Sequence, residues 1–140
     1  MKKAIVLLTL IVISSSFTTI ASNDKLTIKV TINNPEASGT IYMSLYNKET
    51  DFNEKKSLQH KLITITSNSP VTVSFDDLPK GDYAIVCFQD TNANQKLDFT
   101  SFIPDEPWGL SNNVMLMGPP TWKDAQFRLD KDTHIEIQLF

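Results

Sequence analysis

The feature of this sequence that most restricts its fold is the alternation of apolar and polar residues in short segments. In KLTIKVTI, residues 25–32, apolar side chains fall on every second position, which is typical of a strand with one buried face. The stretches at 40–47, 61–67 and 71–75 predict further strands, separated by loops rich in asparagine, glycine or proline. YAIVCFQ, residues 83–89, is almost entirely apolar, which predicts a central strand covered on both faces.

The remaining segments complete an all-β pattern. Residues 48–60 are polar and charged and predict a loop with at most one helical turn. The closing stretches at 125–130 and 134–140 predict a final hairpin. About seven strands at regular spacing predict an antiparallel β-sandwich, Ig-like or transthyretin-like in outline. One long irregular loop, residues 90–122, interrupts this pattern, and loops of that length in compact domains are usually functional or disordered.

The first residues predict a cleaved export signal. Two lysines precede an unbroken apolar run at 4–13, three serines end the run, and Ala21 is a small residue suited to cleavage. The run is shorter than the roughly 20 apolar residues of a membrane-spanning helix, although an uncleaved N-terminal anchor stays as the alternative. We therefore expect a signal peptide at 1–21 and a single domain at 22–140. The expected location is periplasmic or extracellular, with no membrane span after cleavage.

The expected mature chain is acidic and has a single cysteine. Removal of Lys2 and Lys3 leaves eleven basic residues against sixteen acidic ones, a formal net charge of −5. Nucleic-acid binding requires positive charge, so we expect no nucleic-acid partner. Cys87 excludes an internal disulfide because it is the only cysteine in the sequence. Its apolar neighbours predict a buried, unreactive thiol.

The polar stretch DTNANQKLD, residues 90–98, is the strongest candidate for chemistry. Calcium takes about six to eight oxygen ligands, and loops that wrap around it present alternate side chains inward. Here the polar side chains fall on positions one, three, five and nine, and position seven would supply its backbone carbonyl. The predicted ligands are Asp90, Asn92, Asn94, Lys96 through its carbonyl, and Asp98. This array makes a calcium loop one of two interpretations of the stretch.

Two departures lower the expected affinity of this loop. Gln95 stands at position six, where a sharp backbone turn usually requires glycine, and Ser101 replaces the bidentate glutamate of position twelve. Asp105 or Glu106 could fold back to supply a further carboxylate. The affinity expected with so few charges is roughly 0.1–1 mM, as in weak extracellular sites. The alternative is an Asx-rich turn whose side chains bond their own backbone without a metal, and the residues leave both interpretations open.

The long loop also offers residues for ligand recognition. Flat aromatic rings stack on sugars and amide side chains hydrogen-bond to hydroxyl groups, which suggests a glycan- or peptide-binding site as an alternative function. The residues concerned are Trp108, Asn112, Asn113 and Trp122, with Phe99 and Phe102. The competing interpretation is that the rings cap the open end of the sandwich, because aromatic side chains bury large areas.

No residue pattern predicts an enzyme. Asp105 and Glu106 form an adjacent carboxylate pair of the kind used in acid–base hydrolysis, but neighbouring side chains usually point apart. His60 and His134 are distant in sequence and stand at the starts of predicted strands. The sequence has no Ser–His–Asp signature, zinc-ligand spacing or phosphate-binding glycine loop. We expect a non-enzymatic protein, with a hydrolase as the least supported alternative.

Four sequence blocks resemble a known family. They are LPKGDYAIVCFQDTNANQKLD, IPDEPWGLSNN, GPPTWKDAQFRL and IEIQL, spread over roughly residues 25–140. Together they are similar to the bacterial family of secreted domains of unknown function 2141 (DUF2141). The resemblance implies a sandwich like the transthyretin-like and carboxypeptidase-regulatory-like domains, with a D-x-N-x-N-G loop motif. Asp90, Asn92, Asn94 and Asp98 match the family's loop and Gln95 replaces its glycine. The resemblance implies no activity, because the family's role is undefined.

These observations together predict an exported, non-enzymatic β-sandwich module, stabilised by calcium through the Asp90–Asp98 loop. The expected partner is an envelope or extracellular protein, or a glycan.

Overall fold

The structure, a computed structural model, describes residues 25–140, and the predicted signal segment at 1–21 lies outside this range. In chain order the elements are β1 (Leu26–Asn33), β2 (Gly39–Tyr46), α1 (Glu49–Asn53), β3 (Gln59–Ile65), β4 (Val71–Leu78), β5 (Gly81–Asp90), β6 (Phe99–Thr100), β7 (Ile103–Pro104), β8 (Trp108–Leu110), α2 (Trp122–Ala125), β9 (Gln126–Leu129) and β10 (Thr133–Gln138). Seven of these strands have four or more residues, which matches the predicted number.

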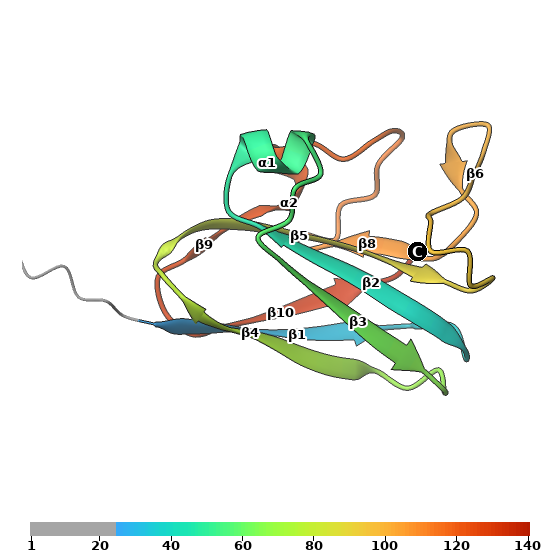
Figure 1. Cartoon of the computed structure of the whole chain (residues 1–140), viewed down its shortest axis with the longest axis horizontal. Helices are drawn as coiled ribbons and strands as arrows, with labels where there is room; N and C mark the ends of the chain where they lie inside the picture. Colours follow the sequence, from blue (N-terminus) through green and yellow to red (C-terminus); the bar gives the residue numbers. More distant parts are fainter. Residues whose placement is uncertain (1–24) are drawn as a thin grey trace, which may run out of the picture.

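Two sheets form the body of the molecule (Figure 1). The three-stranded sheet has the order β10-β1-β4. The five-stranded sheet has the order β3-β2-β5-β8, and β9 pairs with the first residues of β5. β6 and β7 form a separate small hairpin that stands beside the five-stranded sheet. The predicted all-β sandwich is therefore confirmed.

The last two long strands differ from the expected hairpin. β10 pairs in parallel with β1, so that Val30 lies opposite Ile135 and Ile32 opposite Ile137. β9 instead pairs with β5 in the other sheet. Both strands bury one face against the same core. The alternation of apolar and polar residues is the same whether two strands pair edge to edge in one sheet or face each other across the core from different sheets. The pattern therefore predicted the strands correctly and their pairing wrongly.

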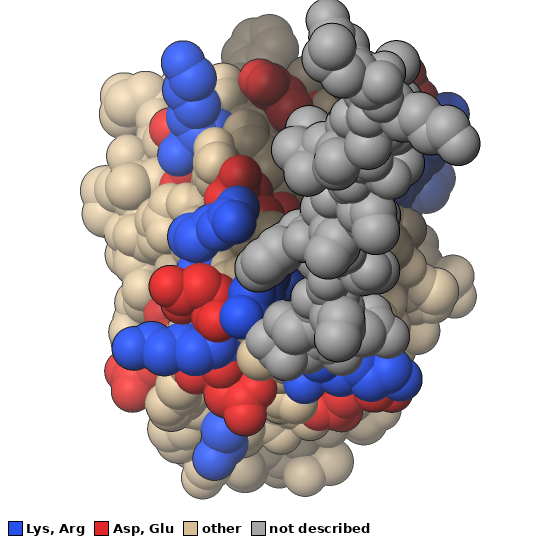
Figure 2. All heavy atoms as spheres, turned by 90° about the vertical axis from the view of Figure 1, so that its left-hand side faces the viewer, with Lys and Arg blue, Asp and Glu red and all other residues tan. Residues whose placement is uncertain are grey.

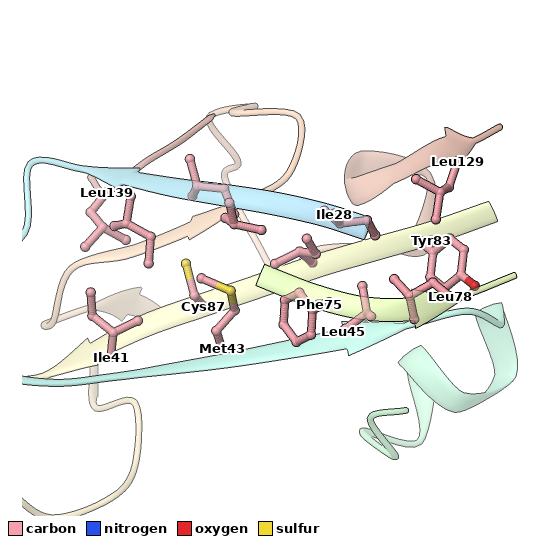
Figure 3. Packing of buried hydrophobic residues seen from close by; sticks show 14 of the residues in the cluster. Ile28, Ile41, Met43, Leu45, Phe75, Leu78, Tyr83, Cys87, Leu129 and Leu139 are labelled. Carbon is pink, nitrogen blue, oxygen red and sulfur yellow. The ribbon is translucent and has the colours of Figure 1, made fainter. Parts of the chain in front are cut away.

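Alternate side chains of both sheets meet in one apolar core (Figure 3). The largest fully buried members include Ile28 and Ile32 of β1, Ile41, Met43 and Leu45 of β2, Phe75 and Leu78 of β4, Tyr83 and Ile85 of β5, Leu129 of β9 and Ile137 of β10. Each such side chain stabilises the fold by roughly 1.5–3 kcal/mol through its removal from water. Cys87 is 1% exposed and belongs to this core, as its apolar neighbours predicted.

A second, smaller cluster covers part of the outer face of the five-stranded sheet. Here α1 lies against β2 and α2 against β5, and they carry Phe52 and Trp122 onto Tyr46 and Ala84. The Phe52 ring meets the rings of Tyr46 and Trp122 edge-on, at centroid distances of 5.1 and 5.9 Å. α1 is the single helical turn predicted between 48 and 60. β5 is covered on both faces over this part of its length, as expected of a central strand.

Charged side chains of both signs are interspersed on the end of the molecule that Figure 2 shows, and they do not gather by sign. Ion pairs join Lys25 to Asp77 at 3.0 Å and Arg128 to Asp82 at 3.2 Å. Pairs as exposed as these contribute about 1 kcal/mol or less each. Within the described range, no helix is both long and apolar enough to cross a bilayer.

Candidate functional site

The 90–98 loop begins where β5 ends and is closed by its own side chains. Asp90 is 2% exposed, and its two carboxylate oxygens accept hydrogen bonds from the backbone N–H groups of Asn94 at 3.2 Å and Gln95 at 2.7 Å. The side-chain oxygen of Asn92 accepts the Asn94 N–H at 3.0 Å, and that of Asn94 accepts the Lys96 N–H at 2.9 Å. These are the Asx-type bonds that Asp and Asn form in tight turns.

Three of the predicted calcium ligands also meet one another. The amide nitrogens of Asn92 and Asn94 donate to the same oxygen of Asp98, at 2.7 and 2.6 Å. Gln95 has a φ of 64°, the left-handed conformation for which the usual motif carries glycine. The backbone thus keeps the turn of a glycine-containing loop in spite of the substitution, at a cost of about 1–2 kcal/mol for a residue with a Cβ atom.

Glu106 folds back onto the base of this loop. It is one of the two residues, with Asp105, that the sequence suggested as the source of a further carboxylate. It is 4% exposed, and its carboxylate accepts the N–H of Thr91 at 2.9 Å and that of Asp98 at 3.4 Å. Asp105 is exposed and accepts the Thr100 hydroxyl at 3.0 Å instead. No three Asp, Glu, His or Cys side chains of residues 25–140 are grouped so that they could hold a metal. A cation in the loop would therefore depend on amide and carbonyl oxygens beside its two carboxylates.

An apolar groove of about 1230 Å³ lies next to this loop, on the outer face of the five-stranded sheet. We call it the outer groove. Its lining includes Val86 and Phe88 of β5 and Trp108 of β8. One side is the arm at 97–104, which contains the β6–β7 hairpin, and the other is the segment 115–120. The groove exceeds the roughly 300–1,000 Å³ of ordinary small-molecule sites.

Large apolar side chains of both walls are exposed to solvent. The exposed fraction is 93% for Phe102 and 69% for Ile103 on the arm, and 77% for Met115 and 105% for Met117 on the opposite segment. Single exposed apolar residues are common, but a group of them around a concavity marks a binding surface. Both methionines and Ile103 were not among the residues that the sequence predicted for a binding site. The stretch VMLMGPP, an apolar run inside a proline-rich loop, was the signal that could have revealed them.

The residues predicted for glycan or peptide recognition are only partly brought together. Phe99, Phe102 and Trp108 line the outer groove. Trp122 is 7% exposed and packs in the cluster beneath α1, as the competing interpretation of a capping ring expects.

Asn112 and Asn113 are occupied by backbone contacts. The Asn112 amide donates to the Gln126 carbonyl at 3.0 Å. The Asn113 side chain donates to the Glu136 carbonyl and accepts from the Gln138 N–H, both at 2.7 Å. Both amides therefore hold the loop against β9 and β10 and do not point into the groove as free donors.

The residues considered for a hydrolase are separated. Asp105 and Glu106 have different hydrogen-bond partners, on the arm and at the base of the loop respectively. His60 lies on β3 of one sheet, and His134 lies on β10 of the other, where its ring contacts the Thr31 hydroxyl at 2.9 Å. Neither histidine lines the outer groove.

Comparison with known proteins gives one match. The family model of DUF2141, described as an uncharacterized protein conserved in bacteria, matches residues 28–137. The chain belongs to this family. No curated protein and no solved structure matches it significantly. The matched range of this DUF2141 member runs from β1 into β10 and includes the 90–98 loop and nearly all of the groove lining.

Proposed function

We propose that this DUF2141 member is an exported, non-enzymatic binding module that holds an apolar ligand in the outer groove. The observation that carries the proposal is the groove itself, a concavity of about 1230 Å³ with exposed aromatic, aliphatic and thioether side chains on both walls. A ligand that covers such side chains gains roughly 25 cal/mol for each Å² of apolar surface removed from water.

The placement of the groove supports a binding role. A rigid sheet supplies its floor through β5 and β8, and its walls are loop segments, which is the usual division between scaffold and recognition surface. The walls stand on opposite sides of the floor and come from separate parts of the chain, 97–104 and 115–120. Methionine in one wall suits ligands of variable shape, because the unbranched thioether side chain adapts its rotamers.

The test is a titration with N-phenyl-1-naphthylamine, an uncharged dye that fluoresces in apolar surroundings. We expect saturable binding by the mature chain, weakened by the double variant Phe102→Ser with Met117→Ser. Both side chains are almost fully exposed, so the folded state tolerates the changes. Leu62→Ser is the matched control, because Leu62 is 57% exposed on β3 and does not line the groove. Dye binding that is absent, or equal in all variants, would overturn the proposal.

Calcium in the 90–98 loop is a second proposed feature, supported by the spacing of the polar side chains and by the closeness of Asn92, Asn94 and Asp98. Both asparagine amide nitrogens donate to Asp98, so an ion there would replace these two hydrogen bonds with contacts to oxygen atoms. The side-chain oxygens of these residues and of Asp90, with the Lys96 carbonyl, are the hard donors that calcium takes. The loop continues into the arm through Leu97, which lines the groove. A bound ion would therefore stabilise one wall of the ligand site. An envelope or extracellular protein or a glycan as partner stays a prediction.

A further inference from the structure

We infer that the ligand of the outer groove is an amphiphile with an aliphatic tail and a negatively charged head group, bound with its head at Lys55. This inference rests on the proposed function above and deepens it by naming the class of ligand.

Charge is distributed unevenly around the outer groove. Among the described residues that line it, Lys55 is the only lysine or arginine, and none is an aspartate or glutamate. Asn53 and Ser101 add neutral polar groups, and most of the other lining side chains are apolar. An anionic head group would meet a cation and no like charge there. A cationic head group would meet Lys55 and find no carboxylate partner.

Lys55 differs from its neighbour Lys56. The Lys56 ammonium lies 2.6 Å from a carboxylate oxygen of Glu54, whereas the ammonium of Lys55 has no ion pair within residues 25–140. Lys55 follows the last turn of α1 with a φ of 56°, a conformation that usually selects glycine at this point of a helix end. Lys55 is exposed and is one of the residues that line the groove, so a charged head group beside it can stay in contact with water.

The apolar part of the groove suits a tail. Beyond Lys55 the lining passes from Phe52 of α1 over Val86 and Trp108 to Phe140 at the chain end, with the exposed side chains of both walls on either side. A flexible aliphatic chain makes non-directional contacts, and the mainly apolar side chains of the lining can provide them. An amphiphile bound in this way would place its charged head group beside Lys55 and its aliphatic tail on the apolar floor of the groove.

The experiment displaces the bound dye with three compounds of equal chain length, below their micelle-forming concentrations and at low ionic strength. They are dodecanoate, dodecanol and dodecylammonium. We expect dodecanoate to displace the dye at the lowest concentration. Lys55→Glu should raise the half-displacing concentration of dodecanoate about three- to fivefold, the effect of one exposed ion pair, without changing that of dodecanol. Lys56→Glu, which alters the adjacent lysine outside the groove, should leave both unchanged.

The outcomes separate this inference from the proposed function. Dye binding with no head-group preference, or a preference that Lys55→Glu does not change, overturns the anionic amphiphile and leaves the groove as a binding site. Failure of the dye to bind overturns both. Sedimentation of the ligand-free chain tests a second copy as occupant. A dimer that the Phe102→Ser and Met117→Ser double variant dissociates would show that another protein chain covers the groove, and it would overturn the inference.

Discussion

Cys87 illustrates at the scale of one residue how burial sets chemistry. Its side chain points into the core between the two sheets, and the thiol contacts the Gly109 carbonyl at 3.6 Å (Figure 3). Burial raises the pKa of the Cys87 thiol from 9.0 to about 12, because the thiolate would lose its hydration. The thiol is therefore protonated and unreactive in the folded protein at neutral pH.

This pKa shift predicts a loss of stability at alkaline pH. Above pH 9 the unfolded chain releases the thiol proton while the folded chain keeps it up to about pH 12, so the free energy of unfolding falls as pH rises through this window. The slope approaches about 1.4 kcal/mol per pH unit for one group. Urea unfolding of the wild type and of Cys87→Ala between pH 8 and 10.5 measures it. The difference in free energy of unfolding between the wild type and Cys87→Ala should narrow as pH rises. If this free energy falls with pH at the same rate in both proteins, the raised pKa of Cys87 is contradicted.

Gln89, two residues further along β5, is buried by a different means. Its amide donates to the carbonyls of Glu36 and Ser38 and accepts the Glu36 N–H, at 2.7 to 3.0 Å. All the strong hydrogen-bonding atoms of this fully buried side chain are thereby engaged, which offsets the cost of removing an amide from water. One strand thus carries an apolar thiol and a satisfied amide on the same face.

At the scale of elements, the approach of β8 to β10 joins the two sheets at one edge. Trp108 and Phe140 exchange backbone hydrogen bonds at 3.0 and 3.3 Å. Gly109 lies in this contact, and a Cβ atom at its position would stand 2.6 Å from the Gln138 carbonyl oxygen and 2.7 Å from the Ile137 Cγ2 atom. Position 109 requires glycine because a Cβ atom there would collide with the backbone of Gln138, which cannot rotate away as a side chain can.

We expect Gly109→Ala to destabilise the fold by about 1–3 kcal/mol, the cost of forcing an extra group into a packed site. Gly118→Ala serves as the control, because a Cβ atom there would meet nothing within 4 Å, and its effect should stay within about 0.5 kcal/mol. Chemical denaturation of both variants measures the difference. Equal stabilities would show that the β8–β10 edge yields more readily than its backbone contacts indicate.

The 90–98 loop is the element whose role calcium would decide. We expect the melting temperature of the mature chain to be higher in millimolar calcium than in chelator, with a stabilisation of about 1.4 kcal/mol at ten times the dissociation constant. Asp98→Asn should abolish that difference, since it removes the charge and keeps the size of the side chain. Asp105→Asn, which changes a carboxylate bonded to Thr100 instead of the loop, should preserve it.

Calcium-independent melting of the wild type would assign the loop to the Asx-turn interpretation. Asp90→Ala is less informative than Asp98→Asn, because the Asp90 carboxylate is buried and accepts two backbone N–H groups whether or not an ion is present. Its loss would therefore destabilise the turn in both conditions, by about 1–3 kcal/mol for donors left without a partner.

At the scale of the whole molecule, the loop and the groove form one continuous region. The Glu106 carboxylate ties Thr91 and Asp98 to the start of β8, and the backbone N–H of Asp105 donates to the Asp98 carbonyl at 2.9 Å. These bonds close the arm at 97–104 against the loop, and the arm is one wall of the outer groove. A change in the conformation of the 90–98 loop should therefore also move the arm and change the shape of the outer groove.

Local patterns were sufficient to predict several elements. The alternation at 25–32 predicted β1, and the polar stretch at 48–60 predicted no more than the turn of α1. The apolar run at 83–89 predicted the central strand β5, although its outer face is covered only in part and the outer groove lies over Val86 and Phe88. The spacing of Asp90, Asn92 and Asn94 likewise predicted a loop organised by its own side chains. Each of these depends on contacts between residues close in sequence, or on which face of a strand is apolar.

The pairing of β10 with β1 and the outer groove needed the tertiary structure. A strand pattern records that one face is buried, but the partner strand is chosen by the packing of the whole core. The groove likewise combines α1, the floor strands, the arm, the segment 115–120 and the chain end, which are far apart in sequence. The sequence by itself determined an all-β chain with an Asx-rich loop, because both follow from local spacing. Only the tertiary structure decided that exposed Phe102, Met117 and Lys55 surround one apolar concavity, because that depends on how distant segments pack.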